Sequence, residues 1–142
     1  MKKLLLLLFL GFSIVGFSQN TAIPDSNFEQ ALIDLGLDTA PINGSVPTAN
    51  ISAVTSLVVD NNNIADLTGI EDFIALTYLN CRSNQLTSLD FSNNTALTYL
   101  NCSSNQLTSL DVSNNTALTS LNCYSNQLTS LDVSNNTALT SL

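Results

Sequence analysis

Apolar and polar positions recur every 21 residues along the chain from Leu76 onward. In the unit 97–117, LTYLNCSSNQLTSLDVSNNTA, apolar side chains occupy the first, fourth, sixth, eleventh, fourteenth and sixteenth positions. Around Leu100 the apolar and polar residues alternate, which predicts a short strand with one buried face. Because one unit cannot cover its own apolar side chains, we expect the units to stack and their strands to form a parallel sheet, with neighbours about 4.8 Å apart.

The second half of the unit, LTSLDVSNN, repeats this alternation and is expected to form the opposite wall of a thin coil. The alternation leaves open which wall is concave, and the Asn-Gln-Leu sequence that follows the first half favours the first. An Asn ends that half of every unit, and its side chain can hydrogen-bond backbone groups left unpaired in the next coil. We therefore expect a structural ladder of Asn62, Asn84, Asn105 and Asn126.

The segment before the repeats has a different pattern. Its apolar residues Phe28, Ala31, Leu32 and Leu35 recur at helical spacing, with Asp25 or Ser26 available as the N-cap and Gly36 as a stop. A short helix at about residues 25–35 is therefore expected to cover the open end of the first coil, because solenoids require caps.

The first eighteen residues have the three regions of a secretory signal peptide. Lys2 and Lys3 precede an apolar run, and small residues precede Gln19. The alternative is a membrane anchor, but the run is short for a span and is interrupted by glycines. The pattern predicts export, to the medium or the outer cell surface.

The charge of the chain restricts its partners. It has 11 acidic and 3 basic residues, and without Lys2 and Lys3 only Arg82 is basic. Nucleic-acid binding needs clustered basic side chains, and anionic membrane surfaces attract the same clusters. We therefore expect neither a nucleic-acid partner nor membrane insertion after the signal is removed.

Cysteine occurs once in each of three units, at Cys81, Cys102 and Cys123. This regular spacing favours a small apolar core position in successive coils, and one disulfide with one free thiol is the alternative. The chain has no His, and its Ser and Asp residues recur in every unit, whereas a catalytic group is usually unique. We expect no enzymatic activity, no cofactor and no metal.

The spacing LxxLxCxxNxL resembles the leucine-rich repeat, whose consensus is LxxLxLxxNxL in units of about 20–29 residues. This resemblance implies an α/β solenoid, mostly β, with a parallel sheet, repeats of 21 residues and a short N-terminal capping helix. It divides the chain into a signal peptide (1–18), an N-terminal cap (19–53) and repeats (54–142), with units 54–75, 76–96, 97–117, 118–138 and the start of another, 139–142.

The capping stretch 23–32, the unit "ADLTGIEDF" at 65–73 and the repeat LTSLDVSNNTALTSLNC resemble exported leucine-rich repeat proteins of Bacteroidetes, of the flavobacterial type, and more distantly internalins. Members of the flavobacterial group are typically longer and end in a sorting domain. Since the sequence stops four residues into a new unit, the resemblance implies an N-terminal fragment.

Only three columns vary among the copies: Tyr78/Tyr99/Ser120, Arg82/Ser103/Tyr124 and Phe91/Val112/Val133. The first two should flank an outward Asn column on the concave strand, and aromatic and amide side chains suit protein or glycan recognition. The alternative is that exposed positions drift freely after duplication. The predicted ligand-binding residues are Tyr78, Asn80, Arg82, Tyr99, Asn101, Ser103, Ser120, Asn122 and Tyr124.

An acidic column lies in the second half of the units, at Asp90, Asp111 and Asp132. At a spacing of about 5 Å these carboxylates should repel one another, which raises their pKa values, so mild acid is expected to stabilise the array.

Together these patterns predict a non-catalytic, secreted or cell-surface leucine-rich repeat module that binds a protein or glycan through its concave sheet. A structural spacer or adhesive stalk of a larger surface protein is the alternative.

Overall fold

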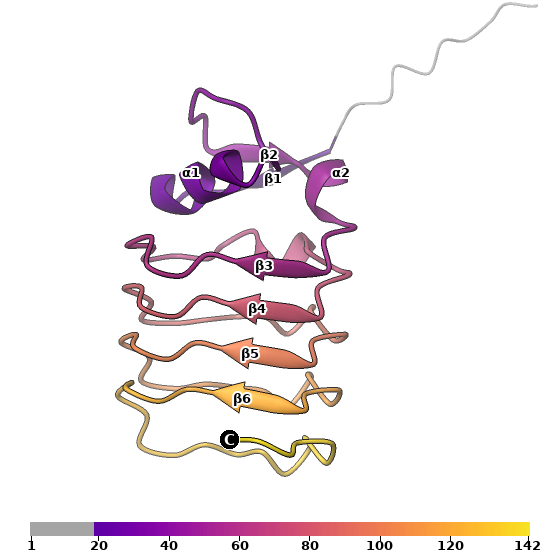
Figure 1. The fold of residues 1–142 in the computed structure, drawn as a ribbon, viewed down its shortest axis with the longest axis vertical. Helices are drawn as coiled ribbons and strands as arrows, with labels where there is room; N and C mark the ends of the chain where they lie inside the picture. Colours follow the sequence, from indigo (N-terminus) through magenta and orange to yellow (C-terminus); the bar gives the residue numbers. More distant parts are fainter. Residues whose placement is uncertain (1–18) are drawn as a thin grey trace, which may run out of the picture.

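The computed structural model describes residues 19–142, so the predicted signal peptide lies outside the described part of the chain. An N-terminal cap lies over one end of a stack of coils (Figure 1). The elements are β1 (Asn20–Ala22), α1 (Ser26–Asp34), β2 (Ser45–Pro47), α2 (Thr48–Ile51), β3 (Ser56–Val58), the 3₁₀ helix η1 (Ile70–Asp72), β4 (Tyr78–Asn80), β5 (Tyr99–Asn101) and β6 (Ser120–Asn122). The predicted, mostly β solenoid with a parallel sheet is confirmed.

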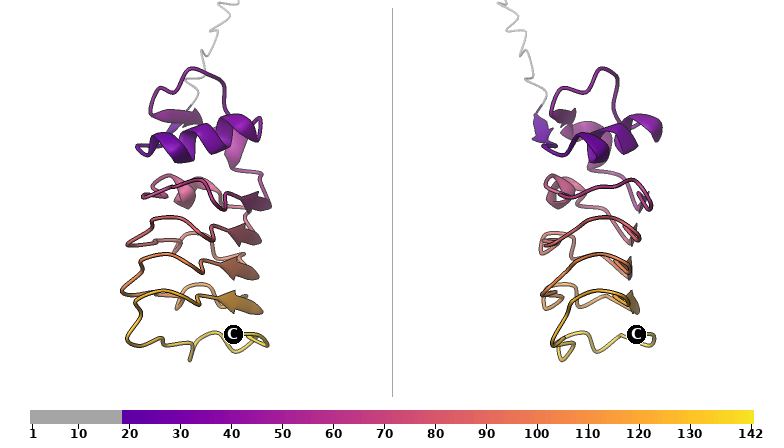
Figure 2. Two further views of the ribbon diagram at one scale, coloured as in Figure 1. Left: turned by 60° about the vertical axis from the view of Figure 1, so that its left-hand side comes forward. Right: turned by 90° about the vertical axis from the view of Figure 1, so that its left-hand side faces the viewer.

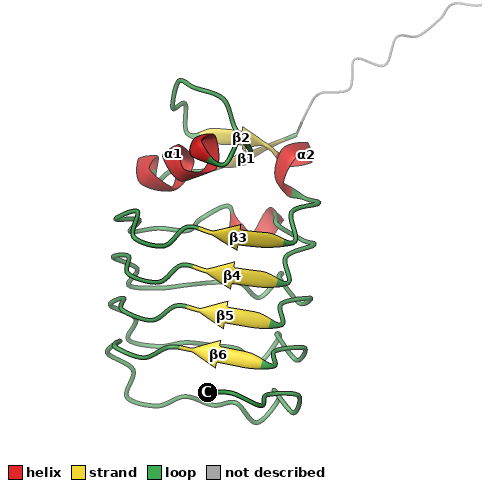
Figure 3. Ribbon diagram, viewed as in Figure 1, coloured by secondary structure: helices red, strands yellow, loops and turns green. Residues whose placement is uncertain are grey.

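The strands β3, β4, β5 and β6 pair in that order, all parallel, and form one wall of the stack (Figures 1 and 3). Tyr78 of β4 is in register with Tyr99 of β5, and Tyr99 with Ser120 of β6. A further parallel bridge joins Ser120 to Ser141. Equivalent positions of the units therefore form straight columns across the sheet.

The second half of each unit forms the opposite wall (Figure 2). It forms no strand and consists of irregular backbone, bends and turns, with the 3₁₀ helix η1 in the first unit, although its alternation resembled that of a strand. The reason lies in local hydrogen bonds: the Asp111 carboxylate accepts from the Ser113 N–H at 2.9 Å, and the Asn115 N–H donates to the carbonyl of Val112 at 3.0 Å. These bonds commit the N–H groups of Ser113 and Asn115 to acceptors in their own turn, so the two groups do not pair with the next coil.

Apolar side chains from every coil meet in one core between the two walls. The strand residues Leu79, Leu100 and Leu121 are buried in it, and so are Phe91 and Val112 of the third variable column. Variation in that column therefore changes core volume, whereas the other two variable columns lie on the strand wall. At the cap, Phe28 of α1 stacks on Phe73 with ring centroids 6.4 Å apart.

The Asn residues after the strands bridge consecutive coils. Asn105 Nδ2 donates to the carbonyls of Cys102 in its own coil (3.0 Å) and Cys81 in the preceding coil (3.1 Å), and its Oδ1 accepts from Leu86 N–H (3.1 Å). Asn84 and Asn126 make the equivalent bonds. The side chain of Asn62, in the first coil, donates to the Asp60 carbonyl of its own coil, while the Asn62 backbone N–H donates to Asn84 Oδ1 at 3.1 Å.

A second Asn ladder runs along the opposite wall, and our sequence interpretation did not identify it. Asn115 Nδ2 donates to the carbonyls of Phe91 at 3.1 Å and Asn94 at 3.0 Å, and Asn136 repeats the arrangement one coil later. These side chains are buried. Both Asn residues of SNN are unchanged in all three copies, so the sequence did not distinguish the buried second Asn from the first.

The capping helix α1 lies within the predicted range. The Asp25 carboxylate accepts from the N–H groups of Asn27 (2.8 Å) and Phe28 (3.0 Å), which caps the first turn. Gly36, with φ of 73°, ends the helix in a Schellman turn closed by Leu37 N–H donating to the Leu32 carbonyl at 2.9 Å. The antiparallel β1–β2 pair was not predicted.

Hydrogen bonds to Asp25 and a close backbone approach at Gly69 are among the contacts that join the cap to the first coil. The second oxygen of Asp25 accepts from the N–H groups of Ala65 at 2.7 Å and Asp66 at 3.0 Å. Gly69, with φ of 104°, lies so close to β1 that a Cβ there would meet the Ala22 carbonyl oxygen at 2.7 Å. The cap and solenoid are thus joined by hydrogen bonds from backbone N–H groups to the Asp25 carboxylate and by close backbone approach.

Within residues 19–142, every helix is too short or too polar to span a bilayer.

We predict that Asp25→Asn weakens the junction between cap and coil, because Asn retains one acceptor for the helix but lacks the second carboxylate oxygen. The free energy of unfolding in urea should fall by about 1–2 kcal/mol at neutral pH. Burial raises the pKa of Asp25, but the N–H groups of Ala65, Phe28, Asp66 and Asn27 together hold it below its ordinary 3.8.

A lowered pKa in the folded state means that the Asp25 contribution is complete above pH 3.8 and is lost as the pH falls below it. The difference between wild type and Asp25→Asn should therefore shrink in acid. An unchanged difference well below pH 3.8 would contradict a charge-dependent role. Asp34→Asn, at the exposed end of α1, is the matched control.

A second prediction concerns the ladder. Asn105→Leu leaves the buried Leu86 N–H unpaired and removes one of the two Asn donors to each of the Cys81 and Cys102 carbonyls, so the free energy of unfolding should fall by about 3 kcal/mol. Urea unfolding followed by circular dichroism measures the loss. Gln106→Leu, the same substitution type at the exposed neighbouring position, should change stability by less than about 0.5 kcal/mol.

Candidate binding face

The predicted ligand-binding residues lie together on the strand wall because β4, β5 and β6 pair in register. The earlier strand β3 adds a fourth row of outward side chains, which our sequence interpretation left out. The alignment of β3 with β4 at an offset of 22 residues could have revealed this row. We call this surface the sheet face. Its residues are Ser56, Val58 and Asp60; Tyr78, Asn80 and Arg82; Tyr99, Asn101 and Ser103; and Ser120, Asn122 and Tyr124.

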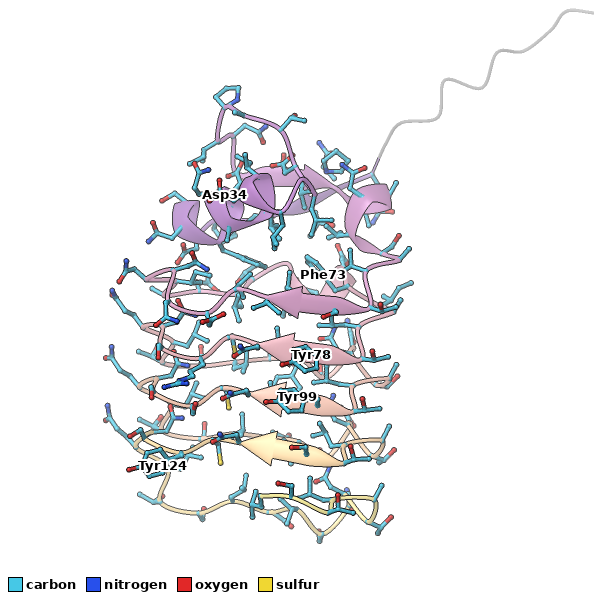
Figure 4. All side chains as sticks on the ribbon, viewed as in Figure 1. Asp34, Phe73, Tyr78, Tyr99 and Tyr124 are labelled. Atoms are coloured by element: carbon cyan, nitrogen blue, oxygen red, sulfur yellow. The ribbon has the colours of Figure 1, made fainter. Side chains whose placement is uncertain are left out.

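Two tyrosines dominate the centre of the sheet face. The rings of Tyr78 and Tyr99 stack with centroids 4.3 Å apart and planes inclined by 5° (Figure 4). Both side chains are half-buried, and burial followed by the neighbouring Tyr99 raises the pKa of Tyr78. The pair forms a rigid aromatic platform, because two strands hold the rings and each ring restricts the other.

Tyr124 lies apart from this pair, beyond the end of β6 (Figure 4). It is 79% exposed, the largest exposed fraction among the exposed large hydrophobic side chains of residues 19–142. Arg82 is also exposed, at the equivalent position of the β4 row. Between them Ser103 is only 4% exposed, and its hydroxyl donates to Asn101 Oδ1 at 2.7 Å. Ser103 therefore offers little surface to a ligand, although we predicted that it would contribute.

The Asn column between the aromatic and variable positions is partly committed to the fold. Asn80, Asn101 and Asn122 each accept, through Oδ1, a hydrogen bond from the backbone N–H two residues later, at 3.1–3.2 Å. These bonds orient the turn after the strand, where Ser104 and its equivalents have positive φ. The Nδ2 groups remain on the sheet face as donors.

The acidic column on the opposite wall contradicts our electrostatic prediction. The pKa values of Asp90, Asp111 and Asp132 are lowered, whereas we expected repulsion to raise them. The backbone N–H and hydroxyl of Ser92 stabilise the Asp90 carboxylate, and these effects exceed the repulsion from Asp111. A hydrogen bond within the turn outweighs a neighbouring charge because the carboxylates are exposed to water, which screens repulsion.

The cysteine column is part of the core. Cys81 and Cys102 are buried, Cys123 is half-buried, and all three thiols are free. Burial raises the pKa of Cys102 to about 12, so this thiol stays protonated and unreactive at neutral pH. The described residues contain no group of three or more metal-ligating side chains arranged to hold an ion.

Comparison with known proteins supports the coil arrangement. The functional domain of InlJ from Listeria monocytogenes, which includes a cysteine ladder, aligns with 88% of this chain at a TM-score of 0.79 and 43% identity. The chain has the leucine-rich repeat fold. An InlF structure from the same species covers 84% of the chain at a TM-score of 0.69 and 26% identity. Internalin C2, at 21% identity and a TM-score of 0.74, agrees in fold.

The relatives are longer than this chain. The chain covers 28% of the InlJ structure, 43% of the InlF structure and 57% of the internalin C2 structure. Internalin J of Listeria monocytogenes serotype 4b (strain F2365) is 45% identical over 78 residues, which are 55% of this chain and 8% of that protein. No family model matches the chain.

The resemblance to flavobacterial proteins was wrong. The relatives found are internalins of Listeria, a Firmicute. The motifs that suggested the other lineage are the repeat and the cap, and coil packing determines most of their residues. They therefore indicate the fold without indicating the group of bacteria.

We predict that acid destabilises the opposite wall. The folded-state pKa values of the Asp column are lowered, so its contribution is present above the ordinary pKa of 3.8 and is lost as the pH falls below that value. Asp111→Ala should lower the urea midpoint at neutral pH, and Asp111→Asn should lower it less, because a neutral amide oxygen accepts the same turn bond, as Asn101 does, without the charge of the carboxylate. A higher urea midpoint for Asp111→Ala than for wild type would instead show that repulsion between the carboxylates dominates.

Proposed function

We propose that this chain is an exported, non-catalytic module that binds a protein partner through the sheet face. The observation that carries the proposal is the stacked pair Tyr78–Tyr99 on a wall held rigid by in-register strands. Binding energy concentrates in Tyr and Arg side chains that are already ordered before the partner arrives. Arg82 and the exposed Tyr124 extend the same surface.

The distribution of variation supports the same surface. Two of the three variable columns lie on the sheet face, whereas the Ser and Asp columns of the opposite wall are identical in all three copies. The similarity to the InlJ functional domain supports a binding module of this fold. Export rests on the basic start, the apolar run and the small residues of 1–18. We also propose the division of the chain into a signal peptide (1–18), a cap (19–53) and repeats (54–142).

The competing function is a structural spacer or adhesive stalk. The near-identity of the coils favours it, because each coil offers its neighbour the same contacts. A glycan is the other class of ligand for the sheet face, since tyrosine rings and Asn amides also suit sugars. The two functions differ in whether sheet-face side chains matter, and one experiment separates them.

We predict that replacing Tyr78, Tyr99 and Tyr124 together by Ser abolishes binding in a screen against surface proteins and oligosaccharides. Each single change should weaken binding by about tenfold or more, because each removes an aromatic contact. Stability should change little for Tyr124→Ser, since that side chain is exposed. Surface plasmon resonance measures affinity, and thermal unfolding measures stability.

Two control variants make the result specific. Gln106→Ser changes an exposed side chain outside the sheet face and should leave both affinity and stability unchanged. Cys102→Ser places a hydroxyl in the core and should lower stability by about 1–3 kcal/mol. Equal binding by wild type and the triple variant would favour the stalk, and binding only to oligosaccharides would replace the protein partner by a glycan.

A further inference from the structure

The loop between α1 and β2 contains a reactive pair of residues. Asn43 is followed by Gly44, and no other asparagine of the chain precedes a glycine. In such a pair the backbone nitrogen of the glycine can attack the side-chain amide carbon of the asparagine, because glycine has no Cβ to hinder the approach. Asn43 is exposed, and a Cβ placed on Gly44 would have nothing within 4 Å, so the loop has room for this reaction.

A buried carboxylate lies on the attacking nitrogen. Glu29 of α1 is fully buried, although its helix lies at the surface of the cap. Its Oε2 accepts from the Gly44 N–H at 2.8 Å, and its Oε1 accepts from the Asn43 N–H at 2.6 Å. An amide nitrogen is a weak nucleophile until it loses its proton, and a carboxylate at this distance can act as the general base. Glu29 is therefore placed to take the proton of Gly44.

The carbon that is attacked is polarised by two donors. Asn43 Oδ1 accepts from the Ser45 N–H at 3.1 Å and from Ser45 Oγ at 2.8 Å. Two hydrogen bonds to a carbonyl oxygen stabilise the negative charge that develops there when a nucleophile adds to the carbon. Because both donors belong to the residue after Gly44, they also hold the side-chain amide beside the Gly44 peptide.

We propose that Asn43 is a self-modification site, at which the Gly44 nitrogen attacks Asn43 Cγ with Glu29 as the base. The bond from Gly44 N to Cγ forms and the bond from Cγ to Nδ2 breaks, which gives a succinimide. The proton of Gly44 passes to Glu29 and then to the departing nitrogen, which leaves as ammonia. Water then opens the succinimide at either carbonyl and leaves aspartate or isoaspartate at position 43.

The products would alter the cap. Both add a carboxylate to the loop that Glu29 holds, and isoaspartate also adds one atom to the main chain before Gly44. The Gly44 carbonyl accepts from the Ile23 N–H at 2.9 Å, and Ser45 pairs with Ala22 in the β1–β2 sheet. Conversion of residue 43 is therefore a slow, irreversible change that weakens the cap. It does not depend on binding at the sheet face.

Mass spectrometry of the 142-residue chain during incubation at neutral pH tests the proposal. We expect the mass gain that corresponds to exchange of NH₂ for OH, mapped to residue 43, with isoaspartate among the products and release of ammonia. The isolated peptide Pro-Ile-Asn-Gly-Ser has the same local sequence without Glu29 and is the reference. The folded chain should convert about tenfold or more faster than this peptide.

Two variants test the assigned roles. Glu29→Gln retains one acceptor but cannot take a proton, and Ser45→Ala removes the hydroxyl donor to Asn43 Oδ1. Each should slow conversion in the folded chain by about tenfold or more. Because Glu29→Gln changes a buried side chain, Ser45→Ala tests the proposal independently and keeps the backbone pairing of β2. Ser52→Ala, the same change outside the loop, is the matched control and should convert at the wild-type rate.

Three results would overturn the proposal. They are an intact Asn43 in wild type, conversion of the reference peptide as fast as or faster than that of the folded chain, and a wild-type rate in either Glu29→Gln or Ser45→Ala. The second result would show instead that Glu29 holds the loop in a form that protects Asn43. The proposed function fails separately, only if the triple tyrosine variant binds as well as wild type.

Discussion

The solenoid depends on asparagine side chains that satisfy backbone groups where no strand pairs. The strands of the parallel sheet are only three residues long, so most backbone carbonyl and N–H groups of a coil lie outside the strands. Asn105 and Asn115 supply donors to these carbonyls, one beside the sheet and one on the opposite wall. Threonines just before the strands add a third series of side-chain hydrogen bonds between coils. Thr98 Oγ1, for example, donates to the Thr77 carbonyl at 3.0 Å. Unpaired buried backbone groups would otherwise oppose stacking.

The sheet, the core and the first ladder could be predicted because they repeat. A leucine that recurs at the same place in every unit, such as Leu79 or Leu100, is explained by burial in a shared core. The recurring Asn105 is explained in the same way by hydrogen bonds between coils. The second ladder was missed because Asn115 sits in a polar SNN sequence that also suits an exposed loop. The cap was predicted only as a helix, because the β1–β2 pair and the close approach at Gly69 depend on contacts between segments that share no periodic pattern.

The wrong prediction of raised pKa values for the Asp column and the wrong prediction of strand-like structure on the opposite wall have the same origin. The column of Asp90 and Asp111 was read as a set of charges at strand spacing, whereas each carboxylate is an acceptor within its own turn. Register brings the predicted binding residues onto one wall, since in-register strands align Tyr78 with Tyr99, and their role in binding stays a prediction. Register does not determine side-chain exposure, and Ser103 is buried in an outward column whose other members, Arg82 and Tyr124, are exposed.

The identity of successive interfaces has a consequence for the geometry of recognition. A coil such as 97–117 receives from its predecessor the same set of donors and acceptors that it presents to its successor. A copy of the unit can therefore be inserted or removed there without creating an interface of a new kind. Each such step would move Tyr124 relative to Tyr78 by one strand spacing of about 4.8 Å while the core packing stays the same. The distance between recognition side chains is thus a quantity that duplication can adjust in uniform increments, independently of the chemistry of the side chains themselves.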